Sequence, residues 1–419
     1  MSFFLLLLYL VCIIIRPQDW VSGMVAMPLI DILAIFTAFF LFFERAASRS
    51  KVFIRVPQNK LMVGLFVSIV LSHLVHTYFA GLIASFNKFI VLFILFYLML
   101  NVVNTGRKYQ IAVWLIIAMV FVLVFQGMYQ VDHGYGWAGQ NITFDKHRNE
   151  ARINWIGIFN DPNDLALLFV VAVGILLSSL FGKVNFIQRA ASLGAIAFLF
   201  YGIFLTNSRG GLLALMATLF FFFVRKTKRF VFGSIIGGLC IFAIFAIGPS
   251  RLGIISVEEG SAYSRVELWY QGILLFKANP LFGVGFDMYM DSLPQTAHNS
   301  YILALAELGV LGLFFWMALI YSSLKGLSVI QAKDEQLRDS AIGLQSALVG
   351  FCVAAFFLSR TYVIMPYLLF ALSGSLMHVA ARKNNSLNFD FTRADAKHSL
   401  KWSFLVIAFA YAIIKFTYA

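Results

Sequence analysis

Four arginines have the side chain and the setting that suit the binding of a phosphate group. Arg209 stands between Ser208 and two glycines, where the backbone can turn tightly and a ligand can approach closely. Arg265 begins an apolar stretch, Arg360 is a single charge between two apolar runs, and Arg152 closes a basic group. A guanidinium grips a phosphate through two parallel hydrogen bonds, which a lysine cannot do. Each arginine also has an ordinary alternative role. Arg209 and Arg360 would anchor the chain to lipid headgroups. Arg265 would form an ion pair within its helix, and Arg152 would lie on solvated surface.

His298 has the most specific chemistry of any single residue. It precedes Asn299, Ser300 and Tyr301 at the start of a long apolar stretch that predicts a helix. Histidine titrates near neutral pH, so its imidazole can position a hydroxyl group or take its proton. A lone histidine at a helix start is more often structural, and that interpretation stays open. Glu307 is not its expected partner, because nine positions at 100° each place it on the opposite helix face.

Other motifs indicate structure rather than catalysis. Asp161 before Pro162 is typical of a helix start with the aspartate as N-cap, and catalysis by Asp161 is the less favoured alternative. The glycine-containing segment 280–286 lacks the spacing of a nucleotide-binding loop, and no HExxH or GxSxG motif occurs. The three cysteines lie in apolar stretches without zinc or disulfide spacing. The sequence therefore predicts neither a metal site nor a nucleotide cofactor.

The elements that must position these residues are membrane helices. Hydrophobic residues make up 61% of the 419 residues, charged residues make up 12%, and phenylalanine occurs 46 times. A soluble domain carries about 25% charged residues, so this composition indicates a protein embedded in lipid. We expect an all-α fold: a polytopic bundle of about 12–13 transmembrane helices, forming one integral membrane domain over residues 1–419.

The basic residues predict the orientation of the bundle. Apolar runs of roughly 17–25 residues can cross a bilayer, and thirteen approximate runs occur, two of them short. If the N-terminus is cytoplasmic, alternation places 21 of the 32 lysines and arginines in inward loops. The net charge of +13 then reflects topology rather than binding to nucleic acid. The predicted spans are 2–15, 23–43, 61–81, 87–104, 111–131, 163–181, 188–206, 211–224, 230–248, 299–322, 341–358, 362–380 and 402–418.

Two outward segments, 132–162 and 249–298, are too long to be simple connectors. Both contain tryptophan, tyrosine and glycine rather than a disordered composition, so we expect them to be ordered. In the second, apolar residues from Val266 to Leu274 recur at helical spacing and predict a short amphipathic helix. Residues 381–401 are predicted to be a polar cytoplasmic linker to a last helix.

Several motifs follow one another on the same predicted side of the membrane. In order they are Ser208–Arg209–Gly210–Gly211, an Arg265-containing helix, Asn279–Gly285, and His298–Asn299–Ser300–Tyr301 continuing to Gly312. Together they resemble the O-antigen ligase and O-antigen polymerase superfamily, which also includes bacterial O-linked oligosaccharyltransferases. The resemblance runs from about Asn160 to about Phe315. Each motif is weak alone, and their order, spacing and common side make the combination specific.

The resemblance implies a metal-independent, inverting glycosyl transfer by a multi-pass protein, on the periplasmic face of a bacterial inner membrane. The donor would be a glycan on undecaprenyl diphosphate, and the acceptor a sugar hydroxyl of lipid A–core, with no cofactor. Arg209 and Arg265 would stabilise the charge of the leaving diphosphate, and His298 would orient or deprotonate the acceptor hydroxyl. Further contacts to the diphosphate or the acceptor are expected from Arg360, Arg152, Asn299, Tyr301 and Ser208.

Three alternatives stay open. By resemblance, His298–Asn299 followed by Gly309 is a ligase-like signature, but the paired threonines of some ligases are missing here, which leaves a polymerase possible. An O-antigen or exopolysaccharide polymerase would use the same donor with a second lipid-linked unit as acceptor, and a protein O-oligosaccharyltransferase would use a protein. A transporter or flippase for lipid-linked glycans would be expected to show broken helices, midplane charges and repeat symmetry. Here the charges cluster at the outer surface, and no repeat is visible.

Overall fold

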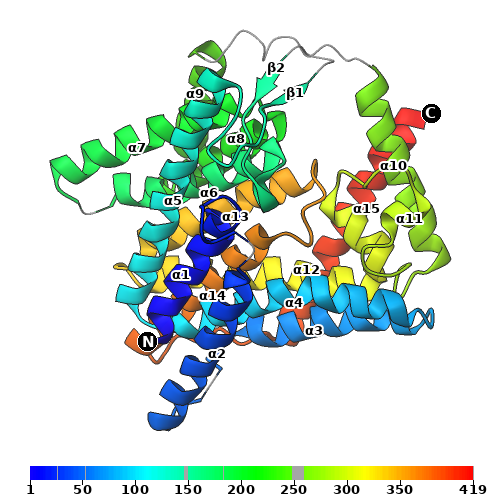
Figure 1. Cartoon of the computed structure of the whole chain (residues 1–419), viewed down its shortest axis with the longest axis horizontal. Coiled ribbons are helices and arrows are strands. Elements are labelled where there is room, and N and C mark those ends of the chain that lie inside the picture. The colour runs from blue at the N-terminus through cyan, green and yellow to red at the C-terminus, as the bar shows by residue number, and fades with distance from the viewer. Residues whose placement is uncertain (26, 52, 146–149, 183, 248–258, 419) are drawn as a thin grey trace.

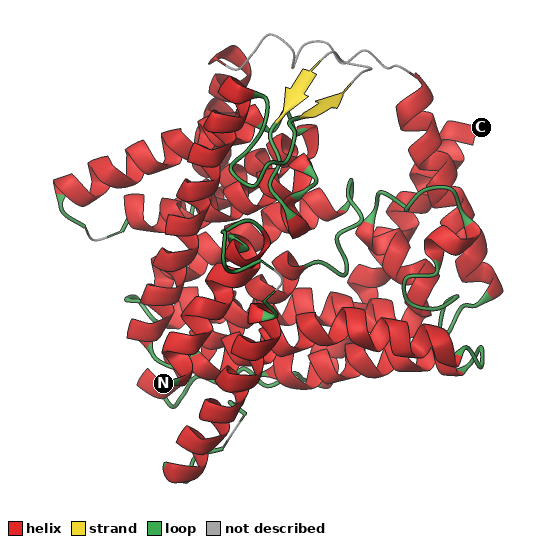
Figure 2. Ribbon diagram, in the orientation of Figure 1, coloured by secondary structure: helices red, strands yellow, loops and turns green. Residues whose placement is uncertain are grey.

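The computed structural model describes residues 1–419 except 26, 52, 146–149, 183, 248–258 and 419. The described chain is almost entirely helical, with one small antiparallel hairpin (Figures 1 and 2). The predicted all-α, polytopic fold is therefore confirmed.

The helices are α1 (Ser2–Ile14), α2 (Leu29–Ala47), α3 (Pro57–Leu74), α4 (Phe79–Val102), α5 (Gly106–His133), α6 (Pro162–Leu180), α7 (Phe186–Leu205), α8 (Arg209–Thr227), α9 (Phe230–Ile247), α10 (Glu259–Ala278), α11 (Tyr289–Ser292), α12 (Ser300–Lys333), α13 (Arg338–Ala355), α14 (Ile364–Lys383) and α15 (Arg393–Tyr418). The strands are β1 (Thr143–Asp145) and β2 (Glu150–Arg152), and two short 3-10 helices are η1 (Pro17–Asp19) and η2 (Gly157–Phe159).

The helices agree with the predicted membrane spans. Each of the thirteen predicted spans overlaps a helix, and α10 and α11 are two further helices inside the outer segment 249–298. Within the part of the chain that the structure describes, eight helices are long and apolar enough to cross a membrane, namely α4 to α8, α12, α14 and α15. α1 and the Phe230–Cys240 part of α9 are apolar but shorter. A multi-pass membrane protein is shown, and the count of thirteen spans stays a prediction.

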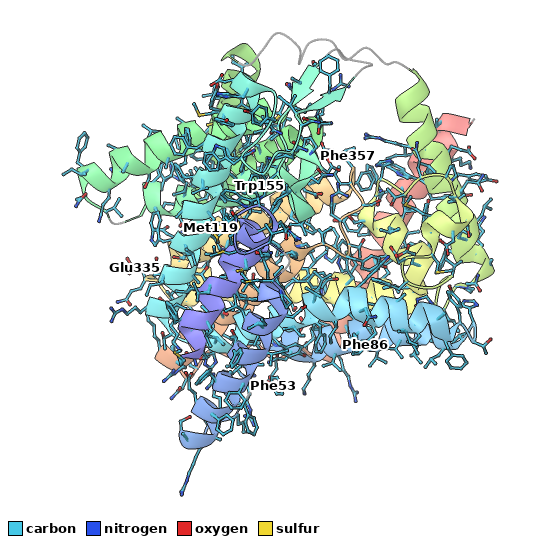
Figure 3. All side chains as sticks on the ribbon, viewed as in Figure 1. Phe53, Phe86, Met119, Trp155, Glu335 and Phe357 are labelled. Atoms are coloured by element: carbon cyan, nitrogen blue, oxygen red, sulfur yellow. The ribbon has the colours of Figure 1, made fainter. Side chains whose placement is uncertain are left out.

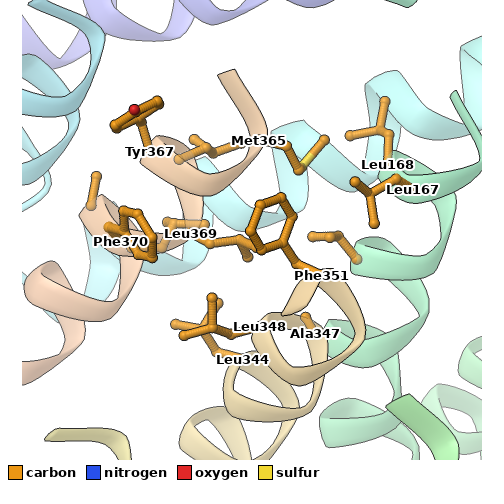
Figure 4. Close-up of a cluster of buried hydrophobic side chains, with 14 of the residues drawn as sticks. Leu167, Leu168, Leu344, Ala347, Leu348, Phe351, Met365, Tyr367, Leu369 and Phe370 are labelled. Carbon is orange, nitrogen blue, oxygen red and sulfur yellow. The ribbon is translucent and has the colours of Figure 1, made fainter. Parts of the chain in front are cut away.

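The core that positions the site lies where α6, α13 and α14 pack together (Figure 4). Phe351 of α13 is buried between Leu168 of α6 and Leu369 of α14. Gly174 lets α6 approach α13 closely, because a Cβ at this position would lie 2.9 Å from the Cβ of Ala347. This packing fixes the start of α6 relative to the turn between α13 and α14.

Helix α12 is broken at Gly309, where the backbone has φ 64° and ψ −163°. The segment 280–285 lies along the break and supplies new backbone partners. The N–H of Val284 donates to the carbonyl of Ala306 at 2.9 Å, and three further backbone hydrogen bonds join the two segments. A Cβ on Gly309 or Gly283 would collide with the backbone of the other segment. The glycines of this motif thus permit backbone-to-backbone packing.

Both predicted outer segments contain regular structure. The first holds the β1–β2 hairpin, and the second holds α10, so the predicted helix is confirmed. Trp269 and Ile273 are buried, whereas Tyr270 and Leu274 are each 38% exposed, so only part of the predicted apolar face packs inward. The predicted linker 381–401 is mostly helical, because α14 and α15 extend into it.

Candidate functional site

Three helix starts are joined at one end of the bundle: those of α6, α8 and α12. Asp161, Ser208 and Asn299 are their N-caps, and each side chain accepts a backbone N–H of its own helix. The predicted capping role of Asp161 is thereby confirmed. A helix N-terminus carries roughly half a positive charge together with unpaired N–H groups, so an anionic ligand is favoured at such ends.

Arg360, in the turn between α13 and α14 (orange in Figure 1), is held by two carboxylates. Its guanidinium forms ion pairs with Asp161 and with Asp164 in the first turn of α6. Its backbone N–H donates to the Oγ of Ser300 at 2.7 Å, at the start of α12. The side chains of Arg360 and Asp164 are each 14% exposed, so the pair is largely shielded from water. The positive charge of Arg360 is therefore compensated within the protein, and it joins three elements.

Asn163 joins a second set of elements. Its Oδ1 accepts hydrogen bonds from the Oγ of Ser208 at 2.7 Å and from Nη2 of Arg152 at 3.0 Å. Arg152 also donates from Nε to the carbonyl of Thr206 at 3.0 Å. The end of β2 and the starts of α6 and α8 are thus tied together. Arg152 is therefore not a freely solvated surface residue, because its side chain donates hydrogen bonds to two neighbouring segments.

His298 lies immediately before the N-cap of α12 and is half-buried. Its backbone φ of 49° is in the left-handed region, which few residues other than glycine occupy. Burial lowers the pKa of His298 from its ordinary value, and the positive charges of Arg265 and Arg360 lower it further, while Asp161 acts in the opposite direction. These three residues therefore lie within electrostatic reach of the imidazole. At neutral pH the ring is uncharged and can accept a proton.

Arg209 is the first residue of α8, and it is exposed. Among the described residues, its side chain has no ion-pair or hydrogen-bond partner. Gly211 lets the start of α8 lie against α6, because a Cβ there would be 2.6 Å from the Cβ of Ala166. A Cβ on Gly210 would lie 3.8 Å from Leu358, just before Arg360 in the chain. An uncompensated guanidinium thus stands beside the ion-paired network.

Helix α10 brings Arg265 to the same end of the bundle. Arg265 is half-buried and has an interaction within the protein besides its electrostatic effect on His298. Farther along α10, the ring of Trp269 packs edge-on against Phe356 with centroids 5.3 Å apart. Phe357, labelled in Figure 3, is the next residue and leads into the Arg360 turn. The helix is therefore anchored beside that turn.

Asn299 and Tyr301 are buried and engaged within the bundle. The Oδ1 of Asn299 accepts from the backbone N–H groups of Tyr301 at 2.9 Å and Ile302 at 3.1 Å. Its Nδ2 has no hydrogen-bond partner among the described residues. The hydroxyl of Tyr301 donates to the carbonyl of Cys352 at 2.9 Å. These contacts fix the start of α12 against α13, and a substrate contact by either residue stays a prediction.

Part of the chain is similar to a known protein family. Residues 194–317 match the family model described as O-Antigen ligase. This match covers less than a third of the chain and supports the resemblance to the O-antigen ligase superfamily. The matched stretch includes Arg209, Arg265 and His298, and members of this superfamily are glycosyltransferase-like ligases and polymerases that act on lipid-linked glycans. A search of curated proteins found no match for the chain.

Two residues of the site were not predicted from the sequence: Asn163 and Asp164. The signal was present, because residues 160–164 contain two carboxylates and two amides on the predicted outer side, where several arginines need partners. The sequence alone does not tell which arginine pairs with which carboxylate, since Arg360 is about 200 positions away from Asp161. Only the packing of α6 against α13 brings them together.

Glu307 lies apart from the network of the candidate site. Its carboxylate is 2% exposed, and Oε1 accepts a hydrogen bond from the backbone N–H of Tyr289 at 3.1 Å. This agrees with the prediction that Glu307 has a partner other than His298. Over the described ranges, no group of three or more histidine, cysteine, aspartate or glutamate side chains is arranged to hold a metal. A metal-independent reaction remains a prediction.

Proposed function

We propose that the chain is an O-antigen ligase, which transfers a glycan from undecaprenyl diphosphate to a sugar hydroxyl of lipid A–core. The proposed location is the bacterial inner membrane, with the site facing the periplasm. One observation carries the proposal: the three residues expected to perform the chemistry lie in the matched stretch and come from elements that meet at one end of the bundle. They are Arg209, Arg265 and His298.

In the proposed reaction, the acceptor oxygen attacks the anomeric carbon of the donor glycan. The new glycosidic bond forms while the bond from that carbon to the diphosphate oxygen breaks, and undecaprenyl diphosphate leaves with the electron pair. His298 takes the proton of the acceptor hydroxyl, which its lowered pKa permits at neutral pH. Arg209 and Arg265 balance the negative charge on the leaving diphosphate. Attack from the face opposite the leaving group inverts the configuration.

We assign different roles to the remaining residues of the site. Arg360, Arg152 and Ser208 act by holding the helix starts in register, since each has partners within the protein. Arg209 has no such partner among the described residues and is available to a phosphate. Preorganised donors cost no rearrangement when the charge develops, so a rigid frame around the uncompensated arginine favours catalysis.

The identity of the acceptor distinguishes a ligase from a polymerase. The experiment is reconstitution of the purified chain in proteoliposomes with a lipid-linked glycan and two competing acceptors, lipid A–core and a second lipid-linked unit. Mass spectrometry then shows which acceptor gains the glycan. Extension of lipid A–core is the expected result. Extension of the second lipid-linked unit would instead name a polymerase, and extension of neither would refute glycan transfer to lipid acceptors.

A lipid-linked glycan transporter is the alternative from another class, and the broken α12 is the feature that favours it. In transporters, the unwound backbone lines a cavity and binds the substrate. Here the backbone groups at the break bond to the segment 280–285, and glycines on both sides make that packing close. The break is thus filled by the protein itself, which favours an enzyme.

A further inference from the structure

A large cavity lies at the end of the bundle remote from the candidate catalytic site. Its volume is about 1030 Å³, and it is bordered by α5, the last turns of α6, α7 and the α12–α13 connection. The site residues Asp161 and Asp164 are at the first turn of α6. Nineteen helical residues separate the two ends of α6, which corresponds to about 28 Å. The cavity is therefore distinct from the proposed diphosphate site.

The cavity has an apolar wall and a polar end. The wall includes Trp114, Ile117 and Phe121 of α5 and Leu176 of α6. Trp114 is 47% exposed, so this wall is open toward the surface that the membrane helices present to lipid. Glu335, labelled in Figure 3, lies at the polar end. An elongated apolar wall beside a polar end suits an amphiphile better than a sugar or a nucleotide.

The charges at the polar end are not equally compensated. Lys226 is ion-paired with Asp339, and Glu335 has an interaction partner of its own. Arg338 also lines the cavity, yet it makes no ion pair or side-chain hydrogen bond with any described residue. Arg225 lies close enough for its like charge to repel that of Arg338. The guanidinium of Arg225 is itself bonded only to neutral side chains among the described residues.

We propose that this cavity is a binding site for an anionic glycerophospholipid, with the phosphate on Arg338 and an acyl chain along Trp114 and Phe121. Basic pockets between transmembrane helices bind anionic headgroups in this way. A phosphate at this position would compensate Arg338 and remove its repulsion with Arg225. The positive-inside pattern predicts that this end of the bundle faces the cytoplasm, so the lipid would come from the cytoplasmic leaflet. The proposal does not depend on glycan transfer at the other end.

The test is native mass spectrometry of the full chain from nanodiscs of equal parts phosphatidylglycerol and phosphatidylethanolamine with matched acyl chains. Wild-type protein should retain phosphatidylglycerol preferentially, and Arg338→Gln should weaken that retention about fivefold, the equivalent of roughly 1 kcal/mol for one arginine at an anionic lipid. Arg107→Gln is the matched control, because Arg107 is exposed on the same predicted side and does not line the cavity. Its retention should match wild type. Equal retention of the two lipids, or equal loss in both variants, would overturn the proposal.

A second measurement locates the lipid without relying on Arg338. Brominated phosphatidylglycerol should quench the tryptophan fluorescence of wild-type protein more than that of Trp114→Phe, and unlabelled phosphatidylglycerol should reverse the difference. No difference between the two proteins would contradict the assigned position. Reversal by an equimolar polyprenyl phosphate but not by unlabelled phosphatidylglycerol would show that the occupant is a carrier lipid, and it would overturn the choice of a glycerophospholipid.

Discussion

Arg360 and Arg209 lie at the same end of the bundle, but only the charge of Arg360 is compensated by carboxylates of the protein. Arg360 is largely buried, forms ion pairs with Asp161 and Asp164, and is anchored by its backbone to Ser300. Arg209 is exposed at the start of α8, and no described residue compensates it. The two arginines looked alike in the sequence, where each was a single charge near an outer turn.

This difference assigns a structural role to Arg360 and a substrate-binding role to Arg209. A buried ion pair is costly to break, because removing one partner leaves an uncompensated charge in a poorly solvated place. An exposed arginine costs little to remove, so its value lies in what it binds. We therefore expect loss of Arg360 to affect folding first and loss of Arg209 to affect transfer alone.

The largest effect is expected for Arg209→Ala. Transfer should fall by about 10²–10³, the range found when one preorganised charge-stabilising donor is removed. The melting temperature in detergent should stay unchanged, because no described contact is lost. Arg209→Lys should restore only part of the activity, since an ammonium cannot bind a phosphate through a planar fork. Full activity of the alanine variant would remove Arg209 from the site.

Arg360→Ala should destabilise the fold by about 3 kcal/mol, because the carboxyl groups of Asp161 and Asp164 would lose the guanidinium that they share in a poorly solvated place. Thermal unfolding of the purified protein measures the effect. Arg393→Ala is a suitable control, because Arg393 is an exposed arginine at the start of α15 and has no part in this network. A stable Arg360→Ala protein that has lost transfer would instead indicate that Arg360 binds the substrate. The proposed difference in role between Arg360 and Arg209 would then be wrong.

Substitutions of Gly210 and Gly211, which follow Arg209, test whether the packing of α8 against α6 positions Arg209. Gly211→Ala should lower both stability, by about 1–3 kcal/mol, and transfer, because its Cβ would press on Ala166 and move the start of α8. Gly210→Ala should be neutral, since a Cβ there meets only Leu358 at 3.8 Å. Parallel measurement of melting temperature and transfer checks the pair. Equal effects of the two substitutions would mean that the close contact of α6 and α8 does not position Arg209.

The pH dependence should give the smallest change. Burial and the nearby arginines lower the pKa of His298, so the neutral form that accepts a proton persists below the ordinary value of 6.5. Transfer should therefore be constant around neutral pH and decline only as the pH falls through that lowered pKa. In Arg360→Lys the positive charge is kept, and the profile should not move. An acid limb centred above 6.5 would show that His298 is not the titrating base in this environment.

The sequence predicted the helices far better than the contacts among them, and the catalytic roles of the candidate residues stay predictions. Each of the thirteen predicted apolar runs overlaps a helix, because lipid constrains each helix locally, whatever its neighbours. Asp161 was predicted as an N-cap from Pro162 beside it, and that local feature is confirmed. Its pairing with Arg360 was not predictable, because it depends on how α6 packs against α13. The glycines of segment 280–286 were set aside for lack of nucleotide-binding spacing, and their structural use appears only beside the broken α12.

The most direct test is a transfer assay with the purified chain in proteoliposomes, using undecaprenyl-diphosphate-linked glycan, lipid A–core and a chelator of divalent metals. We predict that lipid A–core gains the mass of the glycan while undecaprenyl diphosphate is released, and that His298→Ala protein of normal stability does neither. Movement of intact donor across the bilayer without cleavage would contradict the assignment as a glycosyltransferase. Equal transfer by the His298→Ala protein would contradict the proposed site.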